Sequence, residues 1–297
     1  MSIPQFPERR QLELADKQLF DAVFAELQPR ISELTFAGLF LFRTAHTYQV
    51  TMVGDALVVL GEGYDRISGF LPPLSGRVVP AIELLLEEGF TLYGADDSFD
   101  ATYPGLTGLD IVEDRDNFDY IYSRKEMAEL PGNRFHKKKN RINYFIARHD
   151  CKIEAYGEDH QEGSLRLLEE WGRVRAGRGS RSIQLELEAN REALELAGTL
   201  GLSGLVALVE GEVKGFVLGE RLNRETSVCQ FEKADPFLDG IYQLLDREFN
   251  RQLFTDCTFV NREQDLGEPN LRASKLSYHP LELIRKYRVR RVPPSGR

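Results

Sequence analysis

The sequence predicts an α/β (α+β) protein made of two similar halves, each with a mixed central sheet. Three observations support this prediction. A length of 297 residues is typical of two domains. A hydrophobic content of 42% supplies enough apolar surface for ordinary globular cores. The same order of helical and extended patterns also occurs twice along the chain, which indicates an internal duplication.

The first half begins with two helical patterns, at residues 12–27 and 31–42. Two apolar runs follow and flank Gly54-Asp55, a dipeptide that favours a tight hairpin turn. A strand, a helix and another strand complete this half. They are expected at residues 67–71, 79–88 and 91–93.

The second half repeats this order after a short strand at residues 151–156. Two amphipathic helices precede a hairpin whose turn is Glu210-Gly211-Glu212. A strand, a helix that starts near Gly240 and a final strand follow. Because a strand–helix–strand connection is right-handed, we expect these last two strands to be parallel. The ranges are 164–175, 188–200, 205–209, 213–218, 226–231, 240–253 and 258–260.

A segment from residue 120 to residue 145 joins the halves. Ser123 and Glu126 have the S-x-x-E spacing of a capping box, in which the serine side chain accepts from the amide of Glu126. A basic helix ends the segment. We place the boundary after this helix, so that the predicted domains are residues 1–145 and 146–297.

Composition excludes several classes of protein. A net charge of −9 argues against broad nonspecific nucleic-acid binding. No apolar run approaches the roughly 18–20 residues that cross a bilayer, and no apolar leader occurs at the start. The three cysteines form no CxxC pair and have no histidine at metal-ligand spacing, so neither a metal site nor disulfides are expected. We therefore expect a cytoplasmic protein without a membrane-spanning segment.

Two basic groups nevertheless stand out, at residues 134–141 and 285–291. Clustered lysine and arginine supply sequence-independent affinity for phosphates, so the central basic helix could contact the acceptor end of a tRNA. A solvated face on a helix between domains is the alternative, and the sequence alone favours it.

The order of the elements matches the GCN5-related acetyltransferase fold, in which two parallel strands splay apart to admit an acyl carrier. The turn at residues 235–240 follows the first of these strands, and backbone amides near Gly240 could bind the donor phosphate. This turn lacks the Q/R-x-x-G-x-G/A sequence of acetyl-CoA users, and Asp235 and Asp239 would repel a pyrophosphate. The alternative is an ordinary turn in which Asp239 caps the helix.

A polar stretch, residues 261–280, leaves the final strand at its C-terminal end, where α/β proteins place ligand sites. It concentrates hydrogen-bonding and charged groups in what reads as a loop, broken by Gly267 and Pro269. A solvated loop with an Asp265–Arg272 ion pair is the alternative. The polar members are Asn261, Gln264, Asp265, Asn270, Arg272 and Lys275.

This stretch resembles a known family. Asn261-Arg-Glu-Gln-Asp-Leu-Gly267 and Leu271-Arg-x-x-Lys275-x-Ser-Tyr-x-Pro280 are similar to the C-terminal domain of phosphatidylglycerol lysyltransferases. Further matches are Glu232-Lys-Ala-Asp235, Leu130-x-Gly132-x-x-x-x-x-Lys138-x-Asn140-x-Ile-Asn143-x-Phe145 and Ser32-Glu-Leu-Thr-Phe36.

The resemblance implies tandem duplicated GCN5-related N-acyltransferase-like domains, similar also to the aminoacyl-tRNA-dependent transferases of cell-wall peptide synthesis. Membrane-bound relatives transfer lysine or alanine from aminoacyl-tRNA to a lipid hydroxyl. This chain departs from them because its sequence shows no membrane-spanning module. The implied reaction is transfer of an aminoacyl group from aminoacyl-tRNA, or of an acyl group from CoA, to an amine or hydroxyl of a small molecule, peptide or lipid. No tightly bound cofactor is expected.

The resemblance also implies roles for particular residues. Lys275 would neutralise the oxyanion or a terminal phosphate of the tRNA, although a surface lysine is the alternative. Glu232 would orient or deprotonate the attacking amine, and a surface pair with Lys233 is its alternative. The expected substrate-binding residues are Asn261, Asp265, Arg272 and Tyr278.

A function of another class stays open at this point. The weak phosphate turn and the lack of a recognisable catalytic triad are also compatible with a non-catalytic module that binds a small amino compound or peptide. The polar stretch after residue 260 has no counterpart in the first half. We therefore expect any active site to belong to the second half.

Overall fold

The computed structural model describes residues 2–63, 65–103, 105–175 and 181–292, and the chain divides into two units. The first unit comprises Met1–Asp119, Gln264–Arg272 and Leu283–Arg297; the second comprises Tyr120–Glu263 and Ala273–Glu282. This division differs from the boundary expected after residue 145. The linking segment belongs to the second unit, and two C-terminal segments return to the first.

The first unit contains a seven-stranded sheet in the order β1-β2-β3-β4-β5-β14-β6. Its strands are β1 (Arg10–Gln11), β2 (Gln49–Val53), β3 (Ala56–Glu62), β4 (Ser68–Phe70), β5 (Thr91–Asp96), β6 (Leu109–Glu113) and β14 (Lys286–Arg291). Strands β4 and β5 are parallel, and the others pair antiparallel. The hairpin predicted around Gly54 is confirmed. Insertion of the C-terminal strand β14 between β5 and β6 was not foreseen.

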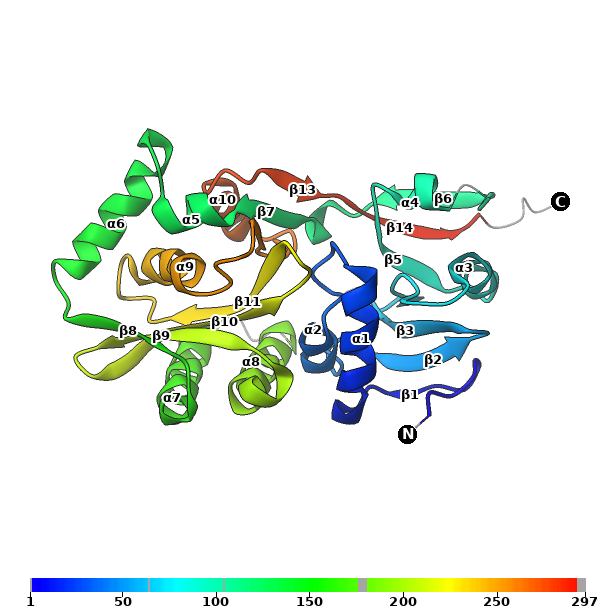
Figure 1. Ribbon diagram of the computed structural model, residues 1–297, viewed down its shortest axis with the longest axis horizontal. Helices are drawn as coiled ribbons and strands as arrows, with labels where there is room; N and C mark the ends of the chain where they lie inside the picture. Colours follow the sequence, from blue (N-terminus) through cyan, green and yellow to red (C-terminus); the bar gives the residue numbers. More distant parts are fainter. Residues whose placement is uncertain (1, 64, 104, 176–180, 293–297) are drawn as a thin grey trace. The chain divides into compact units, whose positions relative to one another are not determined.

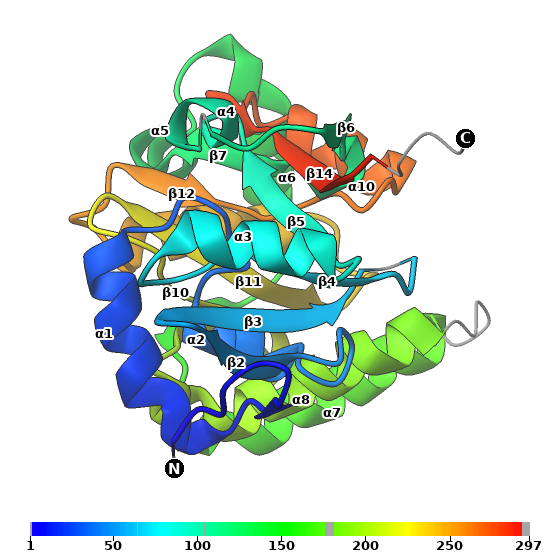
Figure 2. The same ribbon diagram turned by 90° about the vertical axis from the view of Figure 1, so that its right-hand side faces the viewer.

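The helices of the first unit pack around this sheet. They are η1 (Leu14–Asp16), α1 (Lys17–Leu27), α2 (Phe36–Leu41), α3 (Val78–Glu87), α4 (Phe99–Thr102) and η2 (Arg115–Asn117). Helix α3 lies across β4 and β5 (Figure 2) and buries Ile82 and Leu85 against β3, β5 and β14. Helix α2 starts five residues later than expected, because the Thr35 side chain accepts from the amide of Gly38 and caps it there.

The second unit contains a seven-stranded sheet in the order β13-β7-β12-β11-β10-β9-β8. Its strands are β7 (Asp119–Ser123), β8 (Cys151–Ala155), β9 (Ser203–Val209), β10 (Glu212–Arg221), β11 (Thr226–Ala234), β12 (Phe259–Asn261) and β13 (Glu282–Ile284). Strands β11 and β12 are parallel, as predicted. Strand β7, from the linking segment, pairs antiparallel with β12.

The helices of the second unit cover both faces of its sheet. They are α5 (Arg124–Glu129), η3 (Asn133–Phe135), α6 (His136–Ile146), α7 (Glu158–Arg175), α8 (Arg181–Leu200), α9 (Ile241–Gln252) and α10 (Pro269–Leu276). Helices α7 and α8 lie on one side of β9–β11, and α9 lies on the other (Figure 1). The predicted cap is confirmed, since Ser123 Oγ accepts from the Glu126 amide at 3.3 Å. The expectation that residues 261–280 form a loop is wrong from Pro269 onward, where α10 begins.

The parallel strands of each unit separate after a short ladder. In the second unit the ladder between β11 and β12 ends at Val228 and Asn261, although β11 continues to Ala234 beside β10. In the first unit the ladder between β4 and β5 ends at Phe70, while β5 continues to Asp96. This separation is the expected splay of the two parallel strands. In the second unit, the part of β11 after Val228 has no partner strand on the β12 side, and side chains occupy that position.

Candidate functional site

A buried arginine fills the splay of the second unit. Arg262 directly follows β12, and its Nη2 atom lies 2.8 Å from Glu232 Oε2 and 2.8 Å from Asp246 Oδ1. Its Nη1 atom donates to Asp246 Oδ2 at 3.0 Å. Glu232 comes from β11 beyond the end of the ladder, and Asp246 comes from α9. Side chains from β11 and α9 therefore meet at one guanidinium. We call these three residues and Tyr278 the Arg262 cluster.

The alternation of β11 explains why Glu232 faces this cluster. Successive side chains of a strand point to opposite faces of the sheet. Lys233 accordingly lies toward α7 and α8, where its Nζ is 2.8 Å from Glu186 Oε1 and 4.8 Å from the centre of the Trp171 ring. The alternative of a Glu232–Lys233 surface pair is therefore wrong. The Glu232 side chain instead lies on the face of the sheet that α9 covers, and it is only 11% exposed.

The burial of the cluster changes its titration. Burial raises the pKa of Glu232, the charge of Asp246 adds to this rise, and Arg262 opposes both; the resulting pKa is about 8. Burial likewise raises the pKa of Asp246. The pKa of Arg262 is lowered by burial and raised by the two carboxylates, and the net change is upward. The cluster thus holds a permanent cation beside a carboxyl group that exchanges its proton near neutral pH.

Tyr278 and Lys138 complete the surroundings of Arg262. Tyr278 is 3% exposed, and its ring centre lies 5.4 Å from Arg262 Cζ and 3.9 Å from Lys138 Nζ. Lys138 extends from α6 and also donates to Ser277 Oγ at 2.7 Å. Burial lowers the pKa of Lys138 to about 8. This lysine was placed in the family motif but was given no role in the sequence analysis.

A sequence signal for Lys138 did exist. Phe135, Ile142 and Phe145 are the buried residues of η3 and α6. Lys138 lies three residues after Phe135 and four before Ile142, which puts it on the same helical face. Lys137 lies outside that face and is exposed. The inward lysine of the basic run could therefore have been picked out by helical phase.

Lys275 is buried, not a surface lysine. It is 7% exposed, and its Nζ donates to the carbonyl oxygen of Arg262 at 2.6 Å. The carbonyl oxygen of Lys275 in turn accepts from the Tyr122 hydroxyl at 2.8 Å. Lys275 thus holds the backbone at Arg262 in place from α10, next to the Arg262 cluster.

The contacts of Asn261 and Gly240 shape the backbone around them. Asn261 is fully buried, and its Oδ1 accepts from the Glu263 amide at 2.7 Å, which shapes the turn after β12. Gly240 is the N-cap of α9 at φ 105°, so the idea that Asp239 caps this helix is wrong. A Cβ atom at Gly240 would lie 2.3 Å from the carbonyl oxygen of Arg141. The glycine therefore permits close packing of α6 on the start of α9.

Asp265 and Arg272 belong to the first unit, whereas the other predicted site residues belong to the second. Their ion pair is confirmed and is bidentate, with Arg272 Nη2 and Nε at 2.7 Å and 2.9 Å from the Asp265 oxygens. Asp265 is fully buried and also accepts from the Gly267 amide. The pair therefore fixes the turn that leads into α10.

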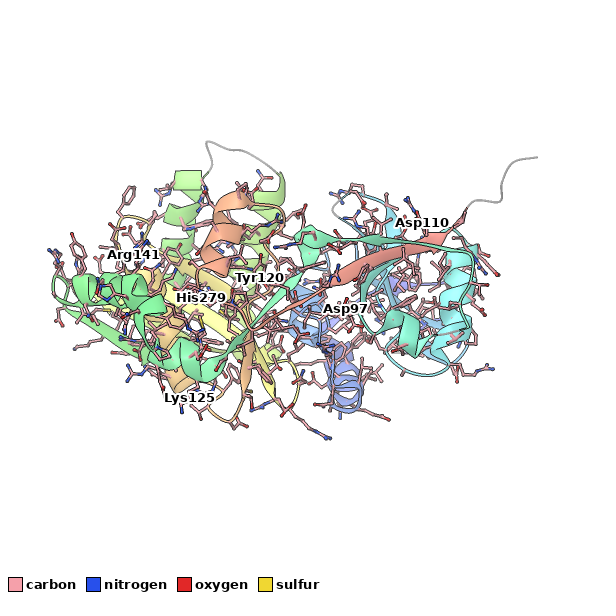
Figure 3. All side chains as sticks on the ribbon, turned by 90° about the horizontal axis from the view of Figure 1, so that it is seen from above. Asp97, Asp110, Tyr120, Lys125, Arg141 and His279 are labelled. Atoms are coloured by element: carbon pink, nitrogen blue, oxygen red, sulfur yellow. The ribbon has the colours of Figure 1, made fainter. Side chains whose placement is uncertain are left out.

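The two basic groups of the sequence have different surroundings. On β14, Arg288, Arg290 and Arg291 each pair with a carboxylate, at 2.8 Å, 2.8 Å and 3.0 Å. Residues 130–148 contain no Asp or Glu. Among the residues that the structure describes, neither Lys137 nor Arg141 takes part in an ion pair, and both side chains are exposed. Figure 3 labels Arg141. The positive charge of α6 is therefore largely available to a partner, while that of β14 is neutralised.

A second buried charge cluster lies within the first unit. Lys286 Nζ is 1% exposed and contacts Asp119 Oδ1 at 2.8 Å and Glu33 Oε2 at 2.6 Å. Ser32 Oγ also donates to Asp119, at 2.9 Å. Ser32 and Glu33, which begin the Ser32–Phe36 match, both contact this cluster. Sequence reasoning missed Lys286, because it reads as part of a basic run.

The described residues contain neither a candidate metal centre nor a candidate membrane-spanning helix. Across residues 2–63, 65–103, 105–175 and 181–292, no group of three His, Cys, Asp or Glu side chains is arranged to hold a metal ion. In the same part of the chain, no helix is both long enough and apolar enough to cross a bilayer.

Two mixed sheets with splayed parallel strands define the class of this protein, a tandem GCN5-related acyltransferase-like fold. The chain belongs to the family described as phosphatidylglycerol lysyltransferase, C-terminal, whose model matches residues 24–290.

Three individual proteins show what the chain is similar to. A conserved protein of unknown function from Bacteroides thetaiotaomicron VPI-5482 is 29% identical, with a TM-score of 0.86 over 95% of this chain and 98% of that one. The structure of L-PGS from Bacillus licheniformis is 15% identical, with a TM-score of 0.64 over 99% of this chain and 95% of that one. An uncharacterized protein of Mycoplasmoides gallisepticum is 27% identical over 213 residues, which are 65% of this chain and 66% of that protein.

Proposed function

We propose that the protein is an aminoacyltransferase that moves an aminoacyl group from aminoacyl-tRNA to an amine or hydroxyl acceptor, with Glu232 as the general base. The observation that carries this proposal is the position of Glu232. It lies on β11 beyond the point where β12 separates, and it is paired with Arg262. Its pKa of about 8 allows it to accept a proton near neutral pH.

The proposed step balances without a cofactor. Glu232 takes the proton of the acceptor amine or hydroxyl, and the acceptor atom forms a bond to the carbonyl carbon of the aminoacyl ester. Negative charge develops on the carbonyl oxygen, and Arg262 or Lys138 is the cation placed to stabilise it. The bond to the ribose oxygen then breaks, and Glu232 returns the proton to that leaving hydroxyl.

The surroundings of Gly240 favour aminoacyl-tRNA over acyl-CoA as donor. The carbonyl oxygen of Arg141 approaches the start of α9, where a bound pyrophosphate would need only hydrogen-bond donors. Oxygen facing oxygen is repulsive there. The exposed cations of α6, by contrast, suit the phosphates of a tRNA acceptor end. The resemblance of the motifs to tRNA-dependent transferases supports the same donor.

Roles for the other predicted residues follow from their contacts. We assign Lys275 to positioning Arg262, because its ammonium is bound to that residue's carbonyl oxygen. Tyr278 is assigned to substrate contact through its hydroxyl. Asn261 supports the turn that carries Arg262. The acceptor class remains amine or hydroxyl, on a small molecule, peptide or lipid.

The test compares Glu232→Gln with Glu186→Gln, which makes the same change on the opposite face of the sheet. Purified variants are incubated with a mixture of labelled aminoacyl-tRNAs and a panel of amine, hydroxyl and lipid acceptors. Loss of a general base should lower the transfer rate about 10²- to 10⁴-fold in Glu232→Gln and leave Glu186→Gln near wild type. Equal melting temperatures establish that both variants are folded.

Three outcomes would count against the proposal. Full activity in Glu232→Gln would remove this residue as the base. Transfer from acyl-CoA but not from aminoacyl-tRNA would overturn the donor assignment. Absence of transfer from every donor, together with ligand-dependent stabilisation by amino compounds, would replace the enzyme with a binding module.

A further inference from the structure

Strand β6 forms one edge of the sheet in the first unit. It pairs antiparallel with β14 on one side, and within the described residues no strand pairs with its other side (Figure 1). The outward amides and carbonyl oxygens of an edge strand can pair with the backbone of another strand. This edge is therefore a place where a strand from another molecule can extend the sheet.

The register with β14 shows which backbone groups of β6 point outward. The amide of Asp114 donates to the first residue of β14, and the carbonyl oxygen of Gly108 accepts from the residue that follows β14. Because hydrogen-bonded pairs alternate along an antiparallel ladder, the even-numbered residues of β6 bond to β14. Leu109, Ile111 and Glu113 therefore turn their amides and carbonyl oxygens toward the open edge.

Two side chains make this edge apolar. Ile111 is 40% exposed and Val112 is 45% exposed, and they point to opposite faces of the sheet because they are neighbours on a strand. Ile111 lies directly opposite Val289 of β14, which is fully buried in the core of the unit. The core therefore extends as far as Ile111, whose side chain is left partly uncovered.

The edge strand β8 of the second unit differs in its side chains. It also has five residues, but its exposed side chains include Lys152 and Glu154. Charged side chains on an edge strand oppose pairing with another strand. The charged residues of β6, Asp110 and Glu113, are each paired with an arginine of their own unit, and this lowers the electrostatic barrier to association.

The partner that fits this edge is a second copy of the same strand. In an antiparallel pair centred on Ile111, Ile111 faces its own copy, Val112 faces Asp110, and Leu109 faces Glu113. Like charges do not face each other, and apolar side chains meet on both faces of the sheet, because Val112 lies diagonally across from its copy. The outward groups of the odd-numbered residues match in this register and form about six backbone hydrogen bonds.

We propose that two copies of the chain associate through β6, so that their first-unit sheets join across a two-fold axis at Ile111. Each copy presents the same patch to the other, so the assembly closes at two copies. Because the strand is short, the buried area lies at the low end for specific interfaces, and we expect a reversible dimer with a dissociation constant on the order of 0.1 mM. Ile111 lies outside the Arg262 cluster, so this inference does not depend on the proposed transfer reaction.

Sedimentation equilibrium of the full chain tests the association. The mean mass should rise from that of one chain toward that of two between about 0.01 and about 0.3 mM. Ile111→Lys places two ammonium groups opposite each other at the axis and should raise the dissociation constant at least about tenfold. Leu19→Lys is the matched control, because it makes the same change on α1 at a side chain that is 44% exposed, and it should associate like wild type. Equal melting temperatures establish that both variants are folded.

Cysteine cross-linking tests the register. Hydrogen-bonded partners in an antiparallel pair have Cα atoms about 5.5 Å apart, which suits a disulfide, so Ile111→Cys should form a disulfide-linked dimer under mild oxidation. Val112→Cys is the matched control, because Val112 is slightly more exposed but lies about 7–8 Å from its copy, too far for a disulfide. Wild type, with its own three cysteines, gives the background.

Three results would overturn the proposal. A mass of one chain at every concentration up to about 0.3 mM would exclude the expected dimer. A dimer that Ile111→Lys leaves unchanged would use another surface. Equal cross-linking of Ile111→Cys and Val112→Cys would show that the strands do not pair in this register. Transfer activity enters none of these results, so the failure of this inference and the failure of the proposed function are distinguishable.

Discussion

Replacement of Arg262 by Met should destabilise the protein in a pH-dependent manner. Met keeps the length and apolar stem of the side chain but leaves Glu232 and Asp246 facing each other without a cation. The arginine side chain is 14% exposed, and the two carboxylates are 11% and 5% exposed, so solvent screens the pair poorly. Breaking a buried ion cluster by removing one partner costs about 3–5 kcal/mol in free energy of unfolding.

The pH dependence identifies the cause of this loss. Without Arg262 the pKa values of both carboxyl groups rise further, because burial and their mutual repulsion are no longer opposed. A raised pKa in the folded state means that the folded protein binds more protons than the unfolded chain. Unfolding free energy then falls as the pH rises from about 5 to about 8, by about 1.4 kcal/mol for each unit of pKa difference. The defect should therefore be largest at pH 8 and smallest at pH 5.

Urea unfolding at both pH values, followed by circular dichroism, measures the effect. Arg290→Met is the matched control, because Arg290 pairs with Asp110 at the surface with its side chain 57% exposed. That variant should change stability by less than about 1 kcal/mol at either pH. A loss of stability in Arg262→Met that is the same at pH 5 and pH 8 would show that packing, not charge, accounts for it, and would refute the reasoning.

Two further predictions concern other parts of the chain. Lys286→Met takes the ammonium group away from the carboxylates of Asp119 and Glu33 in the first unit, so the unfolding free energy at pH 7 should fall by about 3–5 kcal/mol. A loss below about 1 kcal/mol in urea titration would contradict a role for this buried cluster. Gly240→Ala adds a Cβ at positive φ against the Arg141 carbonyl oxygen and should cost about 1–3 kcal/mol, seen as a lower melting temperature. An unchanged melting temperature would show that α6 is not closely packed there.

Local patterns predicted most of the elements. The hairpin at Gly54 needs only a turn residue that tolerates positive φ, and the observed φ is 64°. The cap at Ser123 involves residues three apart, and it forms as predicted. Patterns failed where long-range contacts decided the outcome. Strand β14 is rich in arginine, so its buried residues, Lys286 and Val289, were hidden among charges, and an irregularity in register between them breaks the alternation of a strand.

The candidate site was predicted in part. Glu232, Lys275 and Tyr278 were named from the family motifs, and the structure brings all three to Arg262. Arg262 itself and Asp246 were not named. Asp246 lies on the buried face of α9, where an acidic residue is a weak signal unless its partner is known. The partner is sixteen residues away in sequence and on another element, which a single sequence cannot pair.

Sequence patterns alone were enough to predict the two-part α/β architecture, the parallel strands of the second half and the family. Each of these depends on periodicity, turn chemistry or motif spacing, which are local properties of the chain. The fold was needed to show that β11 continues beyond its ladder with β12 and that Arg262 lies there. It also decided that burial moves the pKa of Glu232 toward neutrality. Desolvation and ion pairing depend on what folds against a residue, and that information lies in distant parts of the chain.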